Sequence, residues 1–174
     1  MKNDKIKIDI VSDVACPWCY VGKKRLESAI KQWDGTEIEV EWHPFQLDPS
    51  IPKEGLDRDT YLTNKFGSLD GPMEMTKRLE ESGKAEGINF NFGKEWLAVN
   101  TLPLHQLLHV AGEEGFKDAL KERFMRAYFD ENLHLNDVDV LSNIMAEYDW
   151  TAEKTNRIIN DDSIAYAVKQ EIAH

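Results

Sequence analysis

The chain has 174 residues, of which 41% are hydrophobic and 30% are charged, which is enough to bury one sizeable core. Aromatic residues make up 10% and glycines number only ten, so a collagen-like, low-complexity or intrinsically disordered protein is excluded. Lysine and arginine total 21 against 32 aspartates and glutamates, a formal net charge of −11. Such a surface repels phosphate backbones and anionic lipid, so we expect neither nucleic acid nor membrane partners.

The opening of the chain predicts a strand, a helix and a second strand. Isoleucines alternate through residues 6–12, as in a half-buried strand. A helical pattern then runs from Pro17 to about Trp33, with Gly35 as the stop signal. Its apolar stripe comprises Cys19, Leu26, Ile30 and Trp33, and its expected solvent side comprises Lys23, Lys24, Arg25, Glu27 and Lys31. Residues 37–43 alternate again, so we expect a right-handed βαβ unit.

Most of the remaining chain predicts helices, after a proline-rich connection. They are expected at about 57–66, 72–83, 100–112, 115–131, 138–148, after Thr151, and at 162–172. The clearest stripe is Phe116, Leu120, Phe124 and Tyr128, at every fourth residue. Expected N-caps are Asn136 or Asp137, Thr151, and Asp161 or Asp162. Residues 87–96 predict a loop in which Phe90, Phe92 and Trp96 serve as core anchors or as a lip facing a substrate.

The two ends of the sequence indicate where the protein is located and whether its core is complete. The N-terminus is polar and lacks the apolar core of a signal peptide, so a cytoplasmic location is expected. The last expected helix stops at His174, and two strands are too few for a stable sheet. The sequence therefore predicts that part of the core lies outside this chain.

The only two cysteines form the motif Cys16-Pro17-Trp18-Cys19 directly after the first strand. At a helix N-terminus, unsatisfied N–H groups and the helix dipole favour a thiolate at Cys16. Cys19 lies one turn on, within reach of a disulfide, and suits a resolving thiol. Pro17 stiffens the first turn, and Trp18 offers an apolar surface to a substrate. The motif predicts a redox-active dithiol.

Two other interpretations of the cysteines stay open. His105 and His109 have the spacing of one helical turn, so a zinc site of two cysteines and two histidines is conceivable. The other interpretation is that the two cysteines are buried and chemically inert. The strand before the motif and the proline within it argue against both, and we expect no metal.

Several segments resemble a known family. Ser12 to Gly22 resembles the opening of DsbA-like thioredoxin-fold oxidoreductases of the FrnE type. Trp42–Pro49 resembles the second strand and following loop of that family, Asn100 to His105 a helix start, and Ala127 to Phe129 a further segment. The resemblance covers essentially the whole chain.

The resemblance implies an α/β fold with a thioredoxin-like βαβ core in residues 1–55. A large all-α insertion in residues 56–174 would lead back toward a C-terminal part of the core. That part, a cis-proline turn, a hairpin and a last helix, is absent, because none of the six prolines fits the turn. Either the chain is a fragment, or a partner such as a second copy in a homodimer supplies the strands.

The activity implied is thiol–disulfide exchange, with Cys16 as nucleophile and Cys19 as resolving thiol. We expect no cofactor, and the partner is a thiol or disulfide of a protein, a peptide or glutathione. Candidate substrate-binding residues are Pro17, Trp18, Asn100 and His105. For Asn100 a helix cap is an equal alternative, and for His105 the alternative is a hydrogen-bonded helix histidine. His43 is assigned no role.

Two rival functions remain at this point. A related branch, the kappa glutathione transferases and hydroxychromene-carboxylate isomerases, shares the architecture but usually has serine at the first cysteine position. Cysteine at both Cys16 and Cys19 favours redox exchange over isomerisation. The other rival is a non-catalytic fragment or interaction module, whose thiols would never interconvert.

Overall fold

The computed structural model describes residues 5–174. Strands β1 (Ile6–Ser12) and β2 (Ile38–Pro44) pair in parallel along their whole length, and α1 (Pro17–Gln32) connects them. The predicted βαβ unit is therefore confirmed. Its charged face carries the glutamates of β2, and its apolar face carries the isoleucines.

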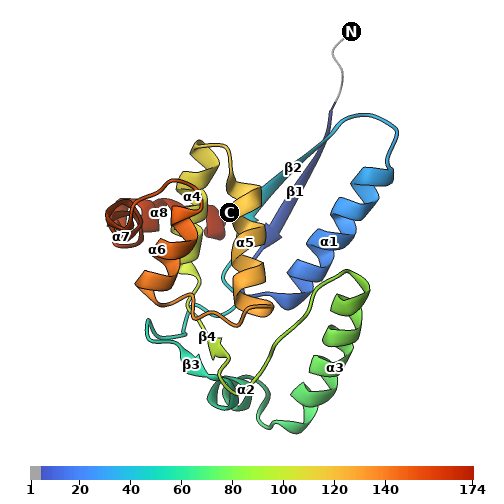
Figure 1. The fold of residues 1–174 in the computed structure, drawn as a ribbon, viewed down its shortest axis with the longest axis vertical. Helices are drawn as coiled ribbons and strands as arrows, with labels where there is room; N and C mark the ends of the chain where they lie inside the picture. The colour runs from blue at the N-terminus through green and yellow to red at the C-terminus, as the bar shows by residue number, and fades with distance from the viewer. Residues whose placement is uncertain (1–4) are drawn as a thin grey trace.

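The rest of the described chain is mainly helical, as predicted. The helices are α2 (Arg58–Phe66), α3 (Asp70–Ala85), α4 (Leu102–Glu113), α5 (Lys117–Phe129), α6 (Val138–Ala146), α7 (Ala152–Ile159) and α8 (Asp162–Ala173). In Figure 1, α4 to α8 gather on one side of the two strands and α1 lies on the other. Helices α2 and α3 lie at the bottom of the view, away from the N-terminus of the chain. No helix within the described residues has both the length and the apolar character to cross a bilayer.

A second, minimal sheet joins the helical part to the loop after β2. Strands β3 (Leu56–Asp57) and β4 (Leu97–Ala98) pair antiparallel. The sequence did not predict them, because two residues are too few to show an alternation. Gly55 precedes β3 with φ +82°, and a Cβ there would lie 2.8 Å from the carbonyl oxygen of Ala98. Only glycine fits this approach of the two segments.

The helical core follows the expected periodicity. Leu120, Phe124 and Tyr128 on α5 are at most 2% exposed. Phe90 stacks edge-on against Phe129, with ring centroids 5.4 Å apart, and Trp96 lies 5.5 Å from Tyr128. The loop of residues 87–96 is therefore held by aromatic anchors. Asp137, Thr151 and Asp161 cap α6, α7 and α8 through side-chain oxygens, as the sequence indicated.

The end of α1 differs from the prediction. Trp33, expected on the buried stripe, is 51% exposed, and it closes the helix in an extended conformation. Its indole N–H donates to the carbonyl oxygen of Thr36 at 2.7 Å, so the ring folds over the following turn. Gly35 is needed there for space, because a Cβ would lie 2.4 Å from that ring; it does not adopt the left-handed stop conformation.

The solvent side predicted for α1 is wrong at Lys23, which is 2% exposed. Its ammonium group pairs with Glu27 one turn on and lies 3.1 Å from Asp118 of α5. Glu122 of α5 lies 3.5 Å away. Because α5 packs against this face and brings carboxylates with it, a lysine is tolerated where helical periodicity alone indicated solvent.

Candidate active site

Cys16 caps the N-terminus of α1. Its backbone is extended (φ −97°, ψ 106°), and Pro17 occupies the first helical position, which has no N–H to leave unpaired. The backbone N–H of Cys19 donates to the Sγ atom of Cys16 at 3.2 Å. Both cysteines are free and partly buried. The fold therefore places the first sulfur where helix N–H groups stabilise a negative charge.

The two thiols titrate as a pair. A hydrogen bond between the sulfurs raises the pKa of Cys16 and lowers the pKa of Cys19 to about 7. The pair therefore carries one thiolate near neutral pH and keeps its second proton. The hydrogen bond between the sulfurs, taken alone, would leave the negative charge on Cys19. The backbone N–H donated to Cys16 and the N-terminus of α1 stabilise the charge on Cys16 instead. We therefore assign the thiolate to Cys16.

Asp13 lies behind the cysteine pair as a buried, ionised carboxylate. Burial raises the pKa of Asp13, but hydrogen bonds from His105, the Leu47 N–H and Thr101 together hold it below the ordinary value. The Leu47 N–H donates at 2.8 Å. The Nε2 atom of His105 lies 3.1 Å from Asp13 and 2.8 Å from the Phe45 carbonyl oxygen, so it carries a proton and donates to both.

Lys121 of α5 is the second buried charge near the pair, at 1% exposure. Burial lowers the pKa of Lys121 to about 8, against the attraction of Asp13 and of the negative charge on the cysteine pair. Its ammonium group lies 5.1 Å from the centre of the Trp42 ring, which stabilises a cation. The positive charge in turn lowers the pKa of Cys19.

Cys16 opens into a cavity of about 300 Å³. The cavity lies between the cysteine turn, the loop after β2, helices α2 and α3, and the segment around β4. Pro17 and Trp18 line it with Cys16, whereas Cys19 is not among its lining residues. Trp18 is 46% exposed at its edge. Cys16, and not Cys19, is therefore the cysteine that lines this cavity.

Asn100 and His105, the other two predicted substrate contacts, do not line this cavity. The carboxamide of Asn100 donates to the Ile51 carbonyl oxygen at 2.8 Å and accepts from the Leu102 N–H at 3.1 Å, so it joins the loop after β2 to the start of α4. His105 is 3% exposed and orients Asp13. Both residues therefore hold neighbouring parts of the site in position and do not contact the cavity.

Sequence reasoning missed Asp13 and Lys121. Asp13 offered a weak signal, a charged residue at the end of an apolar strand three positions before the first cysteine. Lys121 offered none, because it adjoins Leu120 in a helix rich in charged residues. Its ammonium group lies over the ring of Trp42, 79 positions earlier in the numbering, and interacts electrostatically with Asp13 and the cysteines.

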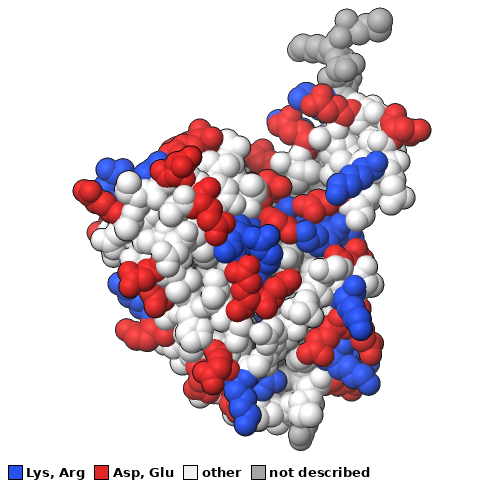
Figure 2. Space-filling model, viewed as in Figure 1, with Lys and Arg blue, Asp and Glu red and all other residues white. Residues whose placement is uncertain are grey.

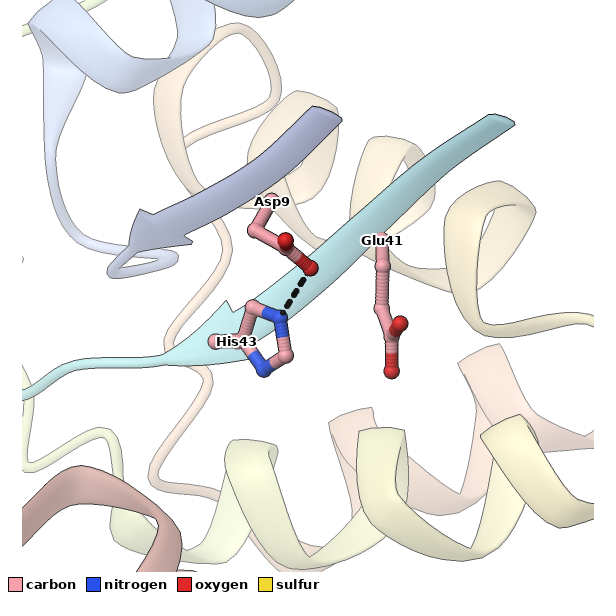
Figure 3. A group of neighbouring side chains, drawn as sticks. All are labelled: Asp9, Glu41 and His43. Carbon is pink, nitrogen blue, oxygen red and sulfur yellow. Dashed lines mark hydrogen bonds and ion pairs between the residues drawn. The ribbon is translucent and has the colours of Figure 1, made fainter. Parts of the chain in front are cut away.

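One group of three potential metal ligands occurs within residues 5–174. Asp9, Glu41 and His43 offer atoms within 4.8 Å of one another on the charged face of the sheet (Figure 3). Asp9 and His43 are hydrogen-bonded at 2.9 Å, which accounts for their approach. The zinc interpretation of the cysteines finds no support in this geometry, because His105 is bonded to Asp13 and His109 to Glu171.

The family model for a DSBA-like thioredoxin domain matches residues 7–174. The chain belongs to this family. Apart from Ile6, the first residue of β1, the matched region contains the βαβ unit, the cysteine pair at the start of α1 and the helical part of the chain. The resemblance to the DsbA-like thioredoxin family and the α/β, thioredoxin-like fold expected from the sequence are thereby confirmed.

Three similar proteins extend the comparison. An uncharacterized protein YwbO of Bacillus subtilis (strain 168) is 30% identical over 142 residues, 82% of this chain and 66% of that protein. A probable DsbA oxidoreductase from Streptomyces coelicolor is 32% identical, with a TM-score of 0.85 over 95% of this chain and 73% of that one. The cytosolic disulfide reductase DsbM of Pseudomonas aeruginosa shares the fold at 16% identity, with a TM-score of 0.64 over 97% of this chain and 75% of that one. The chain thus spans about two thirds to three quarters of these proteins.

Proposed function

We propose that the protein is a thiol–disulfide oxidoreductase in which Cys16 is the nucleophile and Cys19 the resolving thiol. The observation that carries the proposal is the unequal placement of the sulfurs. Cys16 lies at the helix N-terminus and opens into the cavity, whereas Cys19 is one turn behind it. The similarity to a probable DsbA oxidoreductase and the FrnE-type resemblance of the motif support the same activity.

The chemistry would proceed in two exchanges. The Cys16 thiolate attacks one sulfur of a partner disulfide, forms a mixed disulfide and releases the other half as a thiolate. Cys19 then loses its proton, attacks Cys16 and releases the second half, leaving a Cys16–Cys19 disulfide. Lys121 and Asp13 lie behind the pair, and the positive charge of Lys121 favours the thiolate state. The reverse sequence oxidises a dithiol.

Partners for this exchange are thiols or disulfides of proteins, peptides or glutathione. A solved structure of DsbM with glutathione supports glutathione as a redox partner for this chain. The surface offers little to nucleic acid, since acidic and basic side chains interleave on the face shown in Figure 2 and the net charge is −11.

Trapping experiments test the proposal. Cys19→Ser should accumulate mixed disulfides through Cys16 when the reduced protein meets a disulfide, and Cys16→Ser should accumulate none through Cys19. Detection is by mass spectrometry under non-reducing conditions. Equal trapping by both variants contradicts the assignment of the nucleophile. If Cys19→Ser instead keeps full turnover of a small molecule that requires glutathione, the protein is an isomerase or transferase.

A redox titration complements the trapping. Trp18 adjoins both cysteines, so its fluorescence should follow their oxidation in a series of glutathione buffers. A reversible two-electron transition supports the exchange, and its midpoint separates an oxidant from a reductant. Thiols that stay free across the whole series contradict it.

A further inference from the structure

The charged face of the β1–β2 sheet brings two carboxylates to facing positions. Lys7 lies opposite Glu39 in the strand register, and their charged atoms are 3.8 Å apart, as suits opposite charges. The next pair on the same face is Asp9 opposite Glu41. Charges of one sign at facing positions of paired strands repel each other, so this pair is unfavourable unless a cation lies beside it.

His43 joins the two carboxylates on this face, because it follows Glu41 by two positions in β2. Figure 3 shows the three side chains gathered on one side of the sheet, and their ligand atoms all lie within 4.8 Å of one another. The Nε2 atom of His43 lies 2.9 Å from Asp9. The ion pairs of the described strands involve Glu37, Glu39 and Asp9 but not Glu41. One imidazole thus serves two carboxylates, and the charge of Glu41 stays uncompensated.

The spacing of the three groups is close to that of a metal site. A zinc ion holds nitrogen and oxygen ligands at about 2.0–2.2 Å, so two ligand atoms around a tetrahedral ion are about 3.4 Å apart. The Asp9–His43 contact of 2.9 Å has to open only slightly to reach this separation. The side chains of Asp9 and Glu41 are exposed and free to rotate, whereas the paired strands fix the backbone beneath them. Side-chain rotation alone therefore brings the three groups to coordination distance.

We propose that Asp9, Glu41 and His43 form a binding site for a divalent transition-metal ion of the zinc type, with water completing the coordination. The ion replaces the proton between Asp9 and the Nε2 atom of His43, which passes to solvent, and it neutralises the facing carboxylates. An imidazole ligand favours zinc over calcium or magnesium, which prefer oxygen ligands alone. None of the three residues lines the cavity beside Cys16, so the ion bridges β1 and β2 and takes no part in thiol exchange.

The surroundings of the site favour the entry of a cation. Glu41 and His43 border an open groove of about 670 Å³, whose far wall includes His109 of α4 and Glu171 of α8. Carboxylates around the groove attract cations from solvent, although Lys117 lies in it as well. The Nδ1 atom of His109 is bonded to Glu171 at 2.7 Å, and this pair has no third ligand nearby within residues 5–174. His109 therefore serves as an internal control.

This inference differs from the sequence-based expectation of no metal. That expectation weighed zinc at the cysteines together with His105 and His109, and it gave His43 no role. The signal in the sequence is weak, because a strand of alternating glutamates predicts a solvated edge. The ligand set becomes visible only when the register places Asp9 opposite Glu41.

Calorimetric titration with zinc chloride in about 0.15 M salt tests the proposal. Because the thiolates of a reduced cysteine pair also bind zinc, the full chain carries Cys16→Ser and Cys19→Ser in every measurement. One zinc ion should bind per chain with a saturable isotherm. The absence of saturable binding at this ratio overturns the proposal.

Matched variants locate the ion. His43→Gln and Glu41→Gln each remove one ligand while keeping the size of the side chain, and each should weaken zinc binding at least about tenfold. Glu39→Gln removes a carboxylate from the neighbouring pair, and His109→Gln removes the other histidine of the groove. Each of these controls should change the affinity by less than about threefold. If Glu39→Gln matches Glu41→Gln, or His109→Gln matches His43→Gln, the three-residue site is wrong.

Two further measurements identify the ligand atom and the class of ion. In long-range proton–nitrogen NMR spectra of the histidine rings, zinc should shift the Nε2 signal of His43 and leave those of His109 and His134 in place. Shifts at the other rings without one at His43 overturn the assignment. Calcium chloride should bind at least about tenfold more weakly than zinc chloride. Equal affinity for calcium would show that the carboxylates act without the imidazole, which contradicts the proposed class of ion.

Discussion

Replacing Lys121 with methionine tests whether a charged amine is buried behind the cysteine pair. Burial lowers the pKa of Lys121 from its ordinary 10.5 to about 8. Because a tenfold change in proton affinity equals about 1.4 kcal/mol, the native state holds this charge at a disadvantage of roughly 3 kcal/mol. Methionine has a similar length and no charge, so Lys121→Met should be more stable at pH 7 by up to about 3 kcal/mol.

The pH dependence gives the sharper result. Between pH 8 and 10.5 the unfolded chain keeps the proton on Lys121 while the native protein loses it, so the free energy of unfolding should rise with pH across this window. Lys121→Met should lack that rise. The cysteines also titrate here, so both proteins carry Cys16→Ser and Cys19→Ser. Removing the cysteine pair withdraws the one thiolate charge that favours the ammonium, which enlarges the effect.

Urea unfolding at steps from pH 7 to 10.5 measures both quantities. Lys77→Met in the same background is the control, since Lys77 is an exposed lysine of α3. It should reproduce the slope of the parent protein. Equal slopes for Lys121→Met and its parent, or a loss of stability at pH 7 in Lys121→Met, refute the argument that burial of the charge dominates at this site.

Three further predictions concern the pair and the scaffold. Iodoacetamide alkylation, followed by mass spectrometry, should rise through about pH 7, where the cysteine pair loses its first proton; a midpoint near 9 contradicts the paired titration. Tyr128→Phe removes a buried hydroxyl that donates to the Leu97 carbonyl oxygen at 3.0 Å, and should lower the free energy of unfolding in urea by about 1 kcal/mol. Gly55→Ala should lower it by more than about 1 kcal/mol, because φ is +82° and a Cβ would meet β4, whereas Gly22→Ala inside α1 has open space and should raise it.

Local chemistry made much of this protein readable from its sequence. The cysteine motif, the strand–helix–strand order and the stripe through Leu120 and Phe124 depend on residues at most a few positions apart. Caps such as Thr151 act on N–H groups within the next turn. Such signals survive in a linear sequence because the atoms concerned are neighbours along the chain in any fold.

The charged groups behind the site show where sequence reasoning stops. Lys23 and Lys121 lie in helices whose periodicity cannot distinguish a solvent-facing lysine from one that α1, α5 and Trp42 enclose. Asp13 meets His105 across 92 positions of the chain. Each of these contacts forms only when elements distant in the sequence pack together, so no local sequence pattern predicts it.

The sequence by itself determined that a dithiol opens the first helix of a βαβ unit, because spacing and helix-end chemistry are local. Only the tertiary structure decided which cysteine lines the cavity, since the cavity is enclosed by α2, α3 and the segment around β4, all distant from Cys16 in the chain. It also left the indole N–H of Trp96 buried without an acceptor among the described residues. Enclosure and unmet hydrogen bonds are properties of packed surfaces, and they exist only after the chain has folded.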